Sequence, residues 1–159
     1  MANKDIFNTA KAGTTFFMAY LNTVAQEIGN ERAVGLAAKT FENMGAMRGK
    51  MMKEKAGTKK FDAPTLRQAM RDFTKNLGLE SKVVEETPQK VVIRMGACPN
   101  YEAAQEMKID AKAIDAMCHA SCERLADSML KQLGPGFGFR IKKMRSSPSD
   151  YCEHELILA

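Results

Sequence analysis

The side chains with the most chemical potential in this 159-residue chain are four cysteines, all of which lie beyond residue 97. They are Cys98, Cys118, Cys122 and Cys152. Cys118 and Cys122 fall in a stretch with helical periodicity, and residues four apart on a helix share a face with Cβ atoms about 5–6 Å apart. Four convergent thiolates are the ligand set of a structural zinc ion or an iron–sulfur cluster. The sequence therefore predicts that the four cysteines meet and bind one of these, with the identity of the metal left open.

Both histidines lie beside these cysteines, and both are candidate cofactor-binding residues. His154 follows Cys152 by two residues in an expected strand, so the two side chains share a face. His119 adjoins Cys118 on the expected helix, where neighbouring side chains point about 100° apart and cannot face each other directly. A Cys/His nucleophilic pair and simple packing of the cysteines in the core remain alternatives. No catalytic residue is assigned.

Composition indicates one ordinary globular domain over residues 1–159, with 45% hydrophobic and 27% charged residues. There is no apolar run of 18 residues and no uninterrupted apolar segment near the amino terminus, so we expect neither a membrane span nor a signal peptide. A cytoplasmic location follows, where thiols stay reduced. The net charge of +5 is dispersed, and its densest group reads as a solvated loop, so no nucleic-acid partner is expected. That group is Lys53, Lys55, Lys59 and Lys60.

Hydrophobic periodicity divides the chain into a helical amino-terminal layer, residues 1–78, and a carboxy-terminal part, residues 79–159, that contains strands. Gly and Pro positions, together with the N-cap residues Asp62 and Asp110, set the boundaries. Helices are predicted at Asp5–Ile28, Glu31–Lys55, Ala63–Leu77, Tyr101–Met107 and Asp110–Leu133, and strands at Lys82–Thr87, Lys90–Met95, Phe137–Arg145 and Tyr151–Leu158. Short turns between neighbouring strands favour antiparallel pairing. The predicted fold class is α+β, in which N-terminal helices precede a four-stranded antiparallel sheet of ββ-αα-ββ order.

The apolar faces of the first three helices are the predicted core of the helical layer. The methionines of the second helix are expected to fill irregular space in that core. These faces are Phe17, Tyr20, Leu21, Val24 and Ile28, then Leu36, Phe41, Met44, Met47 and Met51, then Leu66, Met70, Phe73 and Leu77. Exposure of large apolar residues on the first helices would instead favour a homodimer.

Several segments of the carboxy-terminal part resemble the L-2-amino-thiazoline-4-carboxylic acid hydrolase family. They are Val91-Val92-Ile93-Arg94, Cys98-Pro99, a two-helix segment with cysteines, Leu133-Gly134-Pro135-Gly136-Phe137 and Asp150-Tyr151-Cys152-Glu153. The layout is also similar to the wider set of 4-vinyl-reductase-like small-molecule-binding domains. The resemblance extends over about Glu31–Leu158, and its specific part is Val91–Leu158.

The resemblance implies a small hydrolase that acts on non-peptide C–N bonds and opens a cyclic amidine to give N-carbamoyl-cysteine. Such a reaction needs an activated water or a thiolate to attack the carbon between nitrogen and sulfur, and a proton donor for the leaving group. Cys98 and Cys152 fall at family-like positions. The alternative is a domain that binds a metal, an iron–sulfur cluster or a tetrapyrrole-like small molecule without turnover. The expected partner in either case is a small-molecule substrate or ligand.

Overall fold

The computed structural model describes residues 4–56 and 61–158, and these ranges contain every element predicted from the sequence. The chain runs α1 (Lys4–Ile28), α2 (Asn30–Ala56), α3 (Ala63–Lys75), β1 (Ser81–Thr87), β2 (Lys90–Met95), α4 (Pro99–Glu106), α5 (Ala111–Cys118), η1 (His119–Glu123), α6 (Arg124–Leu133), β3 (Gly138–Lys143) and β4 (Cys152–Ile157). The predicted α+β class and the ββ-αα-ββ order are confirmed. β3 and β4 are shorter than the predicted strands, because the hydrogen-bonded pairing of the two strands ends where the loop between them begins.

The four strands form one antiparallel sheet in the order β1-β2-β4-β3. Register places Val91 opposite Leu156, Ile93 opposite His154 and Met95 opposite Cys152. Since residues two apart share a face, this alternate set of side chains points to the same side of the sheet. That side carries most of the buried apolar strand residues, so it is the side that packs on the helices.

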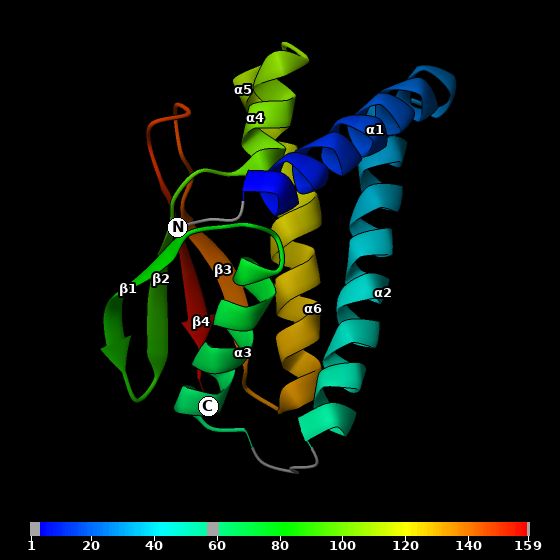
Figure 1. Cartoon of the computed structure of the whole chain (residues 1–159). Helices are drawn as coiled ribbons and strands as arrows, with labels where there is room; N and C mark the ends of the chain where they lie inside the picture. The colour runs from blue at the N-terminus through cyan, green and yellow to red at the C-terminus, as the bar shows by residue number, and fades with distance from the viewer. Residues whose placement is uncertain (1–3, 57–60, 159) are drawn as a thin grey trace.

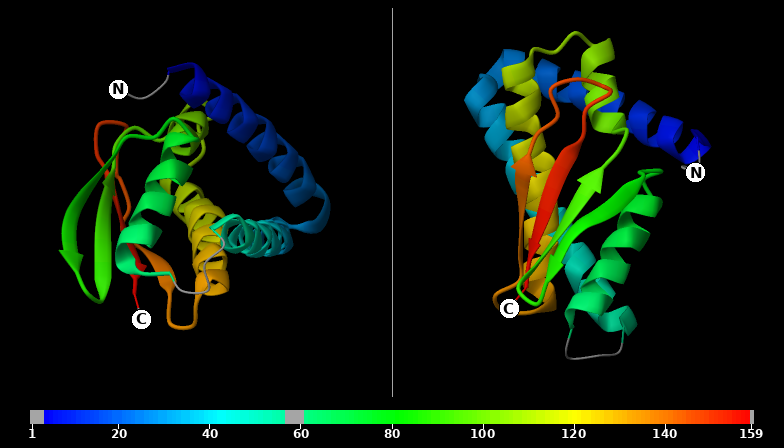
Figure 2. Two further views of the ribbon diagram at one scale, coloured as in Figure 1. Left: turned by 60° about the horizontal axis from the view of Figure 1, so that its bottom comes forward. Right: turned by 90° about the vertical axis from the view of Figure 1, so that its left-hand side faces the viewer.

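Three layers follow one another across the molecule, as Figure 1 shows: the sheet, then α3 beside α6, then α2. Figure 2 confirms that the helix formed by α5, η1 and α6 lies between the sheet and α2. Its N-terminal end is capped by Asp110, whose carboxylate accepts a hydrogen bond from the Ala113 N–H at 3.0 Å. The cysteine-bearing helix is therefore covered on both sides, and only part of its surface meets solvent.

This central helix contains one π-helical turn, η1, in place of the continuous α-helix that the sequence predicted. Cys118 is its N-cap residue, and Cys122 lies within the turn. Turns of this kind are rare and often occur at functional sites. Nothing in the residue types of this segment marks the change, because its hydrophobic pattern fits an α-helix equally well.

The contact between α2 and α6 is made by small residues. Gly45 and Gly49 are buried, and a Cβ atom at either would fall 2.2 Å from the Leu125 carbonyl oxygen or 2.4 Å from that of Met129. Non-bonded atoms cannot approach so closely, so only glycine lets the two backbones touch here. Ala33 and Ala37 continue the same buried ridge toward the start of α2.

The predicted apolar stripe of α2 is wrong as a core face. Four of its five residues lie on the outer side of the helix: Leu36, Met44, Met47 and Met51 are 55%, 40%, 57% and 59% exposed. The fifth, Phe41, is half-buried and packs edge-on against Phe17 of α1. Periodicity detects large apolar side chains and gives little weight to glycine and alanine, which make the actual packing ridge. Tyr20 of α1 is likewise 62% exposed, whereas the predicted face of α3 is confirmed by buried Leu66 and Met70.

Buried side chains form two separate clusters. The larger lies between the sheet, α3 and α6 and includes Cys152. The smaller lies between α1, α4 and α5 around Tyr101 and Ile114, with Cys98 and Cys118 packed against it. The cysteines therefore gather where the two clusters adjoin. No helix within the described ranges is long and apolar enough to cross a bilayer.

The two buried glycines give a direct test of the helix contact. Changing Gly45 to Ala forces the backbones of α2 and α6 apart, and we expect this to lower the free energy of unfolding by about 1–3 kcal/mol, as overpacking does. Gly35→Ala is the matched control, because a Cβ atom there meets nothing within 4 Å. Alanine favours a helix, so the control should gain about 0.5–1 kcal/mol. Equal stability of the two variants in urea denaturation would contradict the assigned contact.

Candidate active site

The centre of the candidate site is a buried arginine. Arg145 follows β3, is 5% exposed, and lies in the interior where the two apolar clusters adjoin. Its Nε donates to the Cys152 sulfur at 3.4 Å, and its Nη2 donates to the carbonyl oxygens of Met95, at 3.3 Å, and Gly96. Its guanidinium carbon lies 5.5 Å from the centre of the Tyr101 ring. One side chain thus joins both clusters to the end of β2.

Arg145 has no acidic partner among the residues that the structure describes. Its three hydrogen bonds go to two neutral carbonyls and one sulfur, and no carboxylate of the described residues forms an ion pair with it. Its Nη1 makes no hydrogen bond to the described part of the chain. A buried cation without a counter-charge is costly, and proteins normally neutralise one with an anion. The position therefore suits either a thiolate or the acidic group of a ligand.

Cys98 lies at the start of α4, as its N-cap residue, and keeps part of its surface exposed. Burial raises the pKa of its thiol above the usual value, while hydrogen bonds from the Tyr101 and Asn100 backbone and the charge of Arg145 act in the opposite direction. Backbone N–H groups at a helix start favour a thiolate, as does a nearby guanidinium. Cys98 therefore shares with Cys152 the electrostatic influence of Arg145.

Cys118 and Cys122 have a different environment. Burial raises the pKa of the Cys118 thiol to about 12, and the nearby Cys98 and Cys152 add to the effect. Burial, followed by Cys98, Cys118 and Cys152, also raises the pKa of Cys122 well above its usual value. The four thiols thus lie close enough to influence one another electrostatically. At neutral pH the helical pair is protonated and is suited to donate a proton rather than to attack.

His154 faces the same interior from β4 but contacts an aromatic ring. Its imidazole lies edge-on to Phe139 with ring centres 5.1 Å apart. Burial lowers the pKa of His154 to about 4, and the charge of Arg145 contributes to the decrease. The ring is therefore neutral at physiological pH, so it could accept a proton or bind a ligand as a neutral imidazole.

His119 lies apart from these groups. Its side chain is 47% exposed, its Nδ1 contacts the Glu123 carboxylate, and its Nε2 lies 3.8 Å from the Asp115 carboxylate. No described contact links it to a thiol. It lines a surface groove of about 440 Å³ between α2, η1 and α6, with Val34, Gly35, Ala38, Ala120, Glu123, Arg124, Asp127 and Phe139. The groove is large enough for a small ligand.

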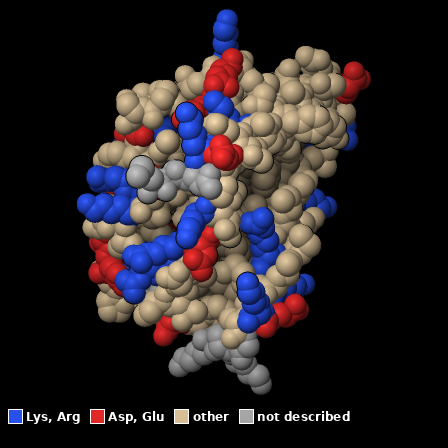
Figure 3. Space-filling model, viewed as in Figure 1, with Lys and Arg blue, Asp and Glu red and all other residues tan. Residues whose placement is uncertain are grey.

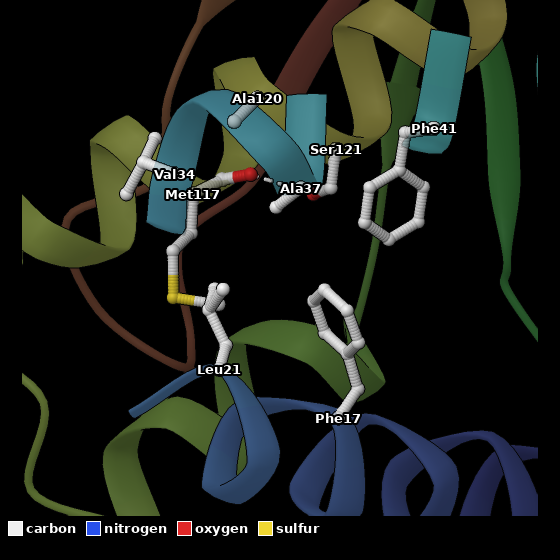
Figure 4. Close-up of a pocket in the computed structure, with 8 residues that line it drawn as sticks. All are labelled: Phe17, Leu21, Val34, Ala37, Phe41, Met117, Ala120 and Ser121. Carbon is white, nitrogen blue, oxygen red and sulfur yellow. Dashed lines mark hydrogen bonds between the residues drawn. The ribbon is translucent and has the colours of Figure 1, made fainter. Parts of the chain in front are cut away.

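A second cavity lies between α1, α2 and the helix that carries the cysteines, and Figure 4 shows its lining. Its free volume of about 10 Å³ is that of roughly one water molecule, so no substrate fits there. Phe17 and Phe41 close one end of it edge-to-face at 5.3 Å. The other lining residues are Leu21, Val34, Ala37, Met117, Ala120 and Ser121.

The sequence predicts that the four cysteines share one site, and the described residues include no group of three or more His, Cys, Asp or Glu side chains arranged to hold a metal ion. The zinc or iron–sulfur site on Cys98, Cys118, Cys122 and Cys152 stays a prediction. Sequence reasoning missed Arg145 altogether. Arg145 follows Phe139 and Ile141 at even spacing, but β3 ends at Lys143 and its register shifts between Ile141 and Lys143, so alternation does not mark Arg145 as inward-facing.

An antiparallel sheet packed on helices, with thiols and an unpaired arginine at one end of its inner face, describes a small α+β domain with a polar site in its interior. The L-2-amino-thiazoline-4-carboxylic acid hydrolase family matches the chain over residues 9–155, so this protein belongs to that family. No curated protein and no solved structure matches the chain. The family match includes all four cysteines, Arg145 and His154.

The low pKa of His154 predicts a pH-dependent stability. The unfolded chain protonates this histidine below its ordinary pKa of 6.5, whereas the folded chain does so only near pH 4. In this range the unfolded state binds more protons, so the free energy of unfolding falls as the pH falls from 6.5 to 4. Below pH 4 the histidine is protonated in both states and causes no further loss. The loss is at most about 3.5 kcal/mol, because each pKa unit corresponds to ~1.4 kcal/mol.

The measurement is urea denaturation of the protein and of His154→Gln at several pH values from 7 to 4. Carboxylates titrate in both proteins, so the difference between them isolates the histidine. The variant should lose less stability than the parent between pH 6.5 and 4. Parallel curves would show that His154 is not buried as a neutral ring.

Proposed function

We propose that this chain hydrolyses a cyclic amidine that carries a carboxylate, of the 2-amino-thiazoline-4-carboxylate type, at the thiol site around Arg145. The thiol site consists of Cys98, Cys118, Cys152 and Arg145. The observation that carries the proposal is the buried, unpaired guanidinium beside Cys152, in a chain of this hydrolase family.

Arg145 supplies two functions in this proposal. Its Nε, which lies 3.4 Å from the Cys152 sulfur, pairs with the thiolate that acts as the nucleophile. Its Nη1, which is free of hydrogen bonds to the described residues, takes one oxygen of the substrate carboxylate. A planar guanidinium can serve both partners because it presents five N–H donors in a fixed geometry.

The Cys152 thiolate attacks the ring carbon between nitrogen and sulfur and forms a tetrahedral centre. That centre then loses its bond to the ring sulfur, which leaves as a thiol after taking a proton. Cys118, whose thiol stays protonated because its pKa is raised to about 12, is the proposed proton donor. The substrate carbon is now held on Cys152 as an isothiourea.

Water then adds to this carbon and displaces the Cys152 thiolate, which leaves N-carbamoyl-cysteine. Neutral His154 is the proposed acceptor of the water proton, since its lowered pKa keeps it unprotonated. This proton then restores the Cys118 thiol, which gave up its own proton in the first step. The balance is one substrate plus one water to one product. This product requires cleavage of the carbon–sulfur bond, whereas cleavage of the carbon–nitrogen bond, the class expected from the sequence, would give the S-carbamoyl isomer.

The test is incubation of the purified protein with L-2-amino-thiazoline-4-carboxylate, with a thiol-reactive dye as the readout. N-carbamoyl-cysteine has a free thiol, whereas S-carbamoyl-cysteine has none, so the dye also tells which bond breaks. Cys152→Ser should lower kcat by about three orders of magnitude or more, as removal of a nucleophile does. Arg145→Lys should lower kcat/KM by about 100-fold, because it removes the fork geometry.

Two matched controls separate the thiol site from the groove. Cys122→Ser changes a thiol that has no role in these steps and should keep most of the activity, and so should His119→Ala. Loss of activity in His119→Ala, together with full activity in Cys152→Ser, would move the reaction to the groove. Absence of turnover by the unchanged protein would reject the hydrolase. Bound zinc, iron or a coloured ligand in such inactive protein would support the binding-module alternative.

A further inference from the structure

The outer face of α2 carries several exposed large apolar side chains that the proposed reaction does not use. Leu36, Met44, Met47 and Met51 are each at least 40% exposed, and Thr40 stands exposed between the first two. They recur every three or four residues, so they form one stripe about 22 Å long at 1.5 Å per residue. Figure 3 shows few charged side chains at the upper right of the surface, over α1, whereas lysines, arginines and some acidic residues lie further down, toward the lower part of α2.

We propose that this stripe pairs with the same stripe of a second copy of the chain, with the two α2 helices antiparallel about a two-fold axis near Met44. In this arrangement Leu36 lies opposite Met51 of the second copy, and Thr40 lies opposite its Met47. Leu36, Met47 and Met51 thus each meet an apolar partner or a threonine methyl group, whereas Met44, beside the axis, comes opposite Asn43. A two-fold interface must be self-complementary in this way, because the same surface supplies both sides.

Charges at the ends of the stripe fit the same register. Arg32 lies one turn before Leu36, and Glu54 lies three residues after Met51, so each Arg32 comes opposite Glu54 of the second copy. Both residues are exposed, and neither forms an ion pair with another of the described residues. A parallel arrangement would place Arg32 against Arg32 and Glu54 against Glu54, so the end charges favour the antiparallel dimer.

One feature of the rim opposes association. The same register brings Lys39 near Lys50 of the second copy, on the side of the stripe that also holds Arg32 and Glu54. Both lysines are exposed and remain solvated, so the repulsion weakens the dimer without preventing it. This gives the register a second and independent test, since removing the repulsion should strengthen the dimer.

The first experiment is sedimentation equilibrium of the unchanged protein, whose monomer mass is 17.6 kDa. A dimer is expected, and Met47→Glu should convert it to a monomer, because the new charge would be buried in the stripe. Phe16→Glu on α1 is the matched control, since Phe16 is 77% exposed but lies outside the stripe. It should leave the dimer intact. Circular dichroism checks that each variant is folded.

Charge exchange then tests the register. Arg32→Glu and Glu54→Arg alone should each raise the dimer dissociation constant several-fold, whereas the double variant should restore it. Lys39→Glu should lower the dissociation constant several-fold. A monomeric unchanged protein would overturn the proposal. Failure of the double variant to restore association, or a dimer that Phe16→Glu disrupts and Met47→Glu does not, would overturn the antiparallel α2 interface.

Discussion

The position of the central helix depends on the direct backbone contact between α2 and α6. Gly45 and Gly49 leave no side chain between the helices, so the carbonyls of Leu125 and Met129 lie against the backbone of α2. Helices held this closely cannot slide past one another without a clash, because protein interiors are close-packed and have low compressibility. The helix with Cys118 and Cys122 is thereby fixed on one side, and its other side must pack on the sheet.

The candidate site depends on a second feature, the positive charge of Arg145, which lies where the two apolar clusters adjoin. Arg145 donates hydrogen bonds from Nε and Nη2 to the Cys152 sulfur and to the carbonyls at the end of β2. Because these acceptors are not carboxylates, the guanidinium keeps its charge available. A carboxylate in the same place would neutralise the guanidinium, which could then no longer pair with an anionic ligand. The outer face of the sheet is different: there Arg140 pairs with Glu155, and Arg94 with Glu153, in ordinary structural contacts.

Burial and the charge of Arg145 act against each other at the cysteines. Burial is the larger influence at Cys98, Cys118 and Cys122 and raises the pKa of each, whereas the Cys152 sulfur accepts a hydrogen bond from Arg145. A metal site on all four would need every thiol to lose its proton, so metal binding would release protons and become stronger with rising pH. The proposed reaction instead uses one thiolate and one thiol. The two hypotheses therefore make opposite demands on the helical pair, and this is why Cys122→Ser distinguishes them.

The amino-acid sequence by itself determined the fold class, the order of the elements and the inward faces of α3 and β4. These depend on local periodicity, caps and turns, which are properties of neighbouring residues. Only the tertiary structure decided three other features. The first is the packing face of α2, which is formed by its glycines and not by its methionines, because the close approach of two backbones depends on the partner helix. The tertiary structure placed a π-helical turn at Cys122. It also brought Arg145 close to Cys98, although 47 residues separate them in the sequence, because long-range packing rather than local pattern determines which distant side chains share an interior.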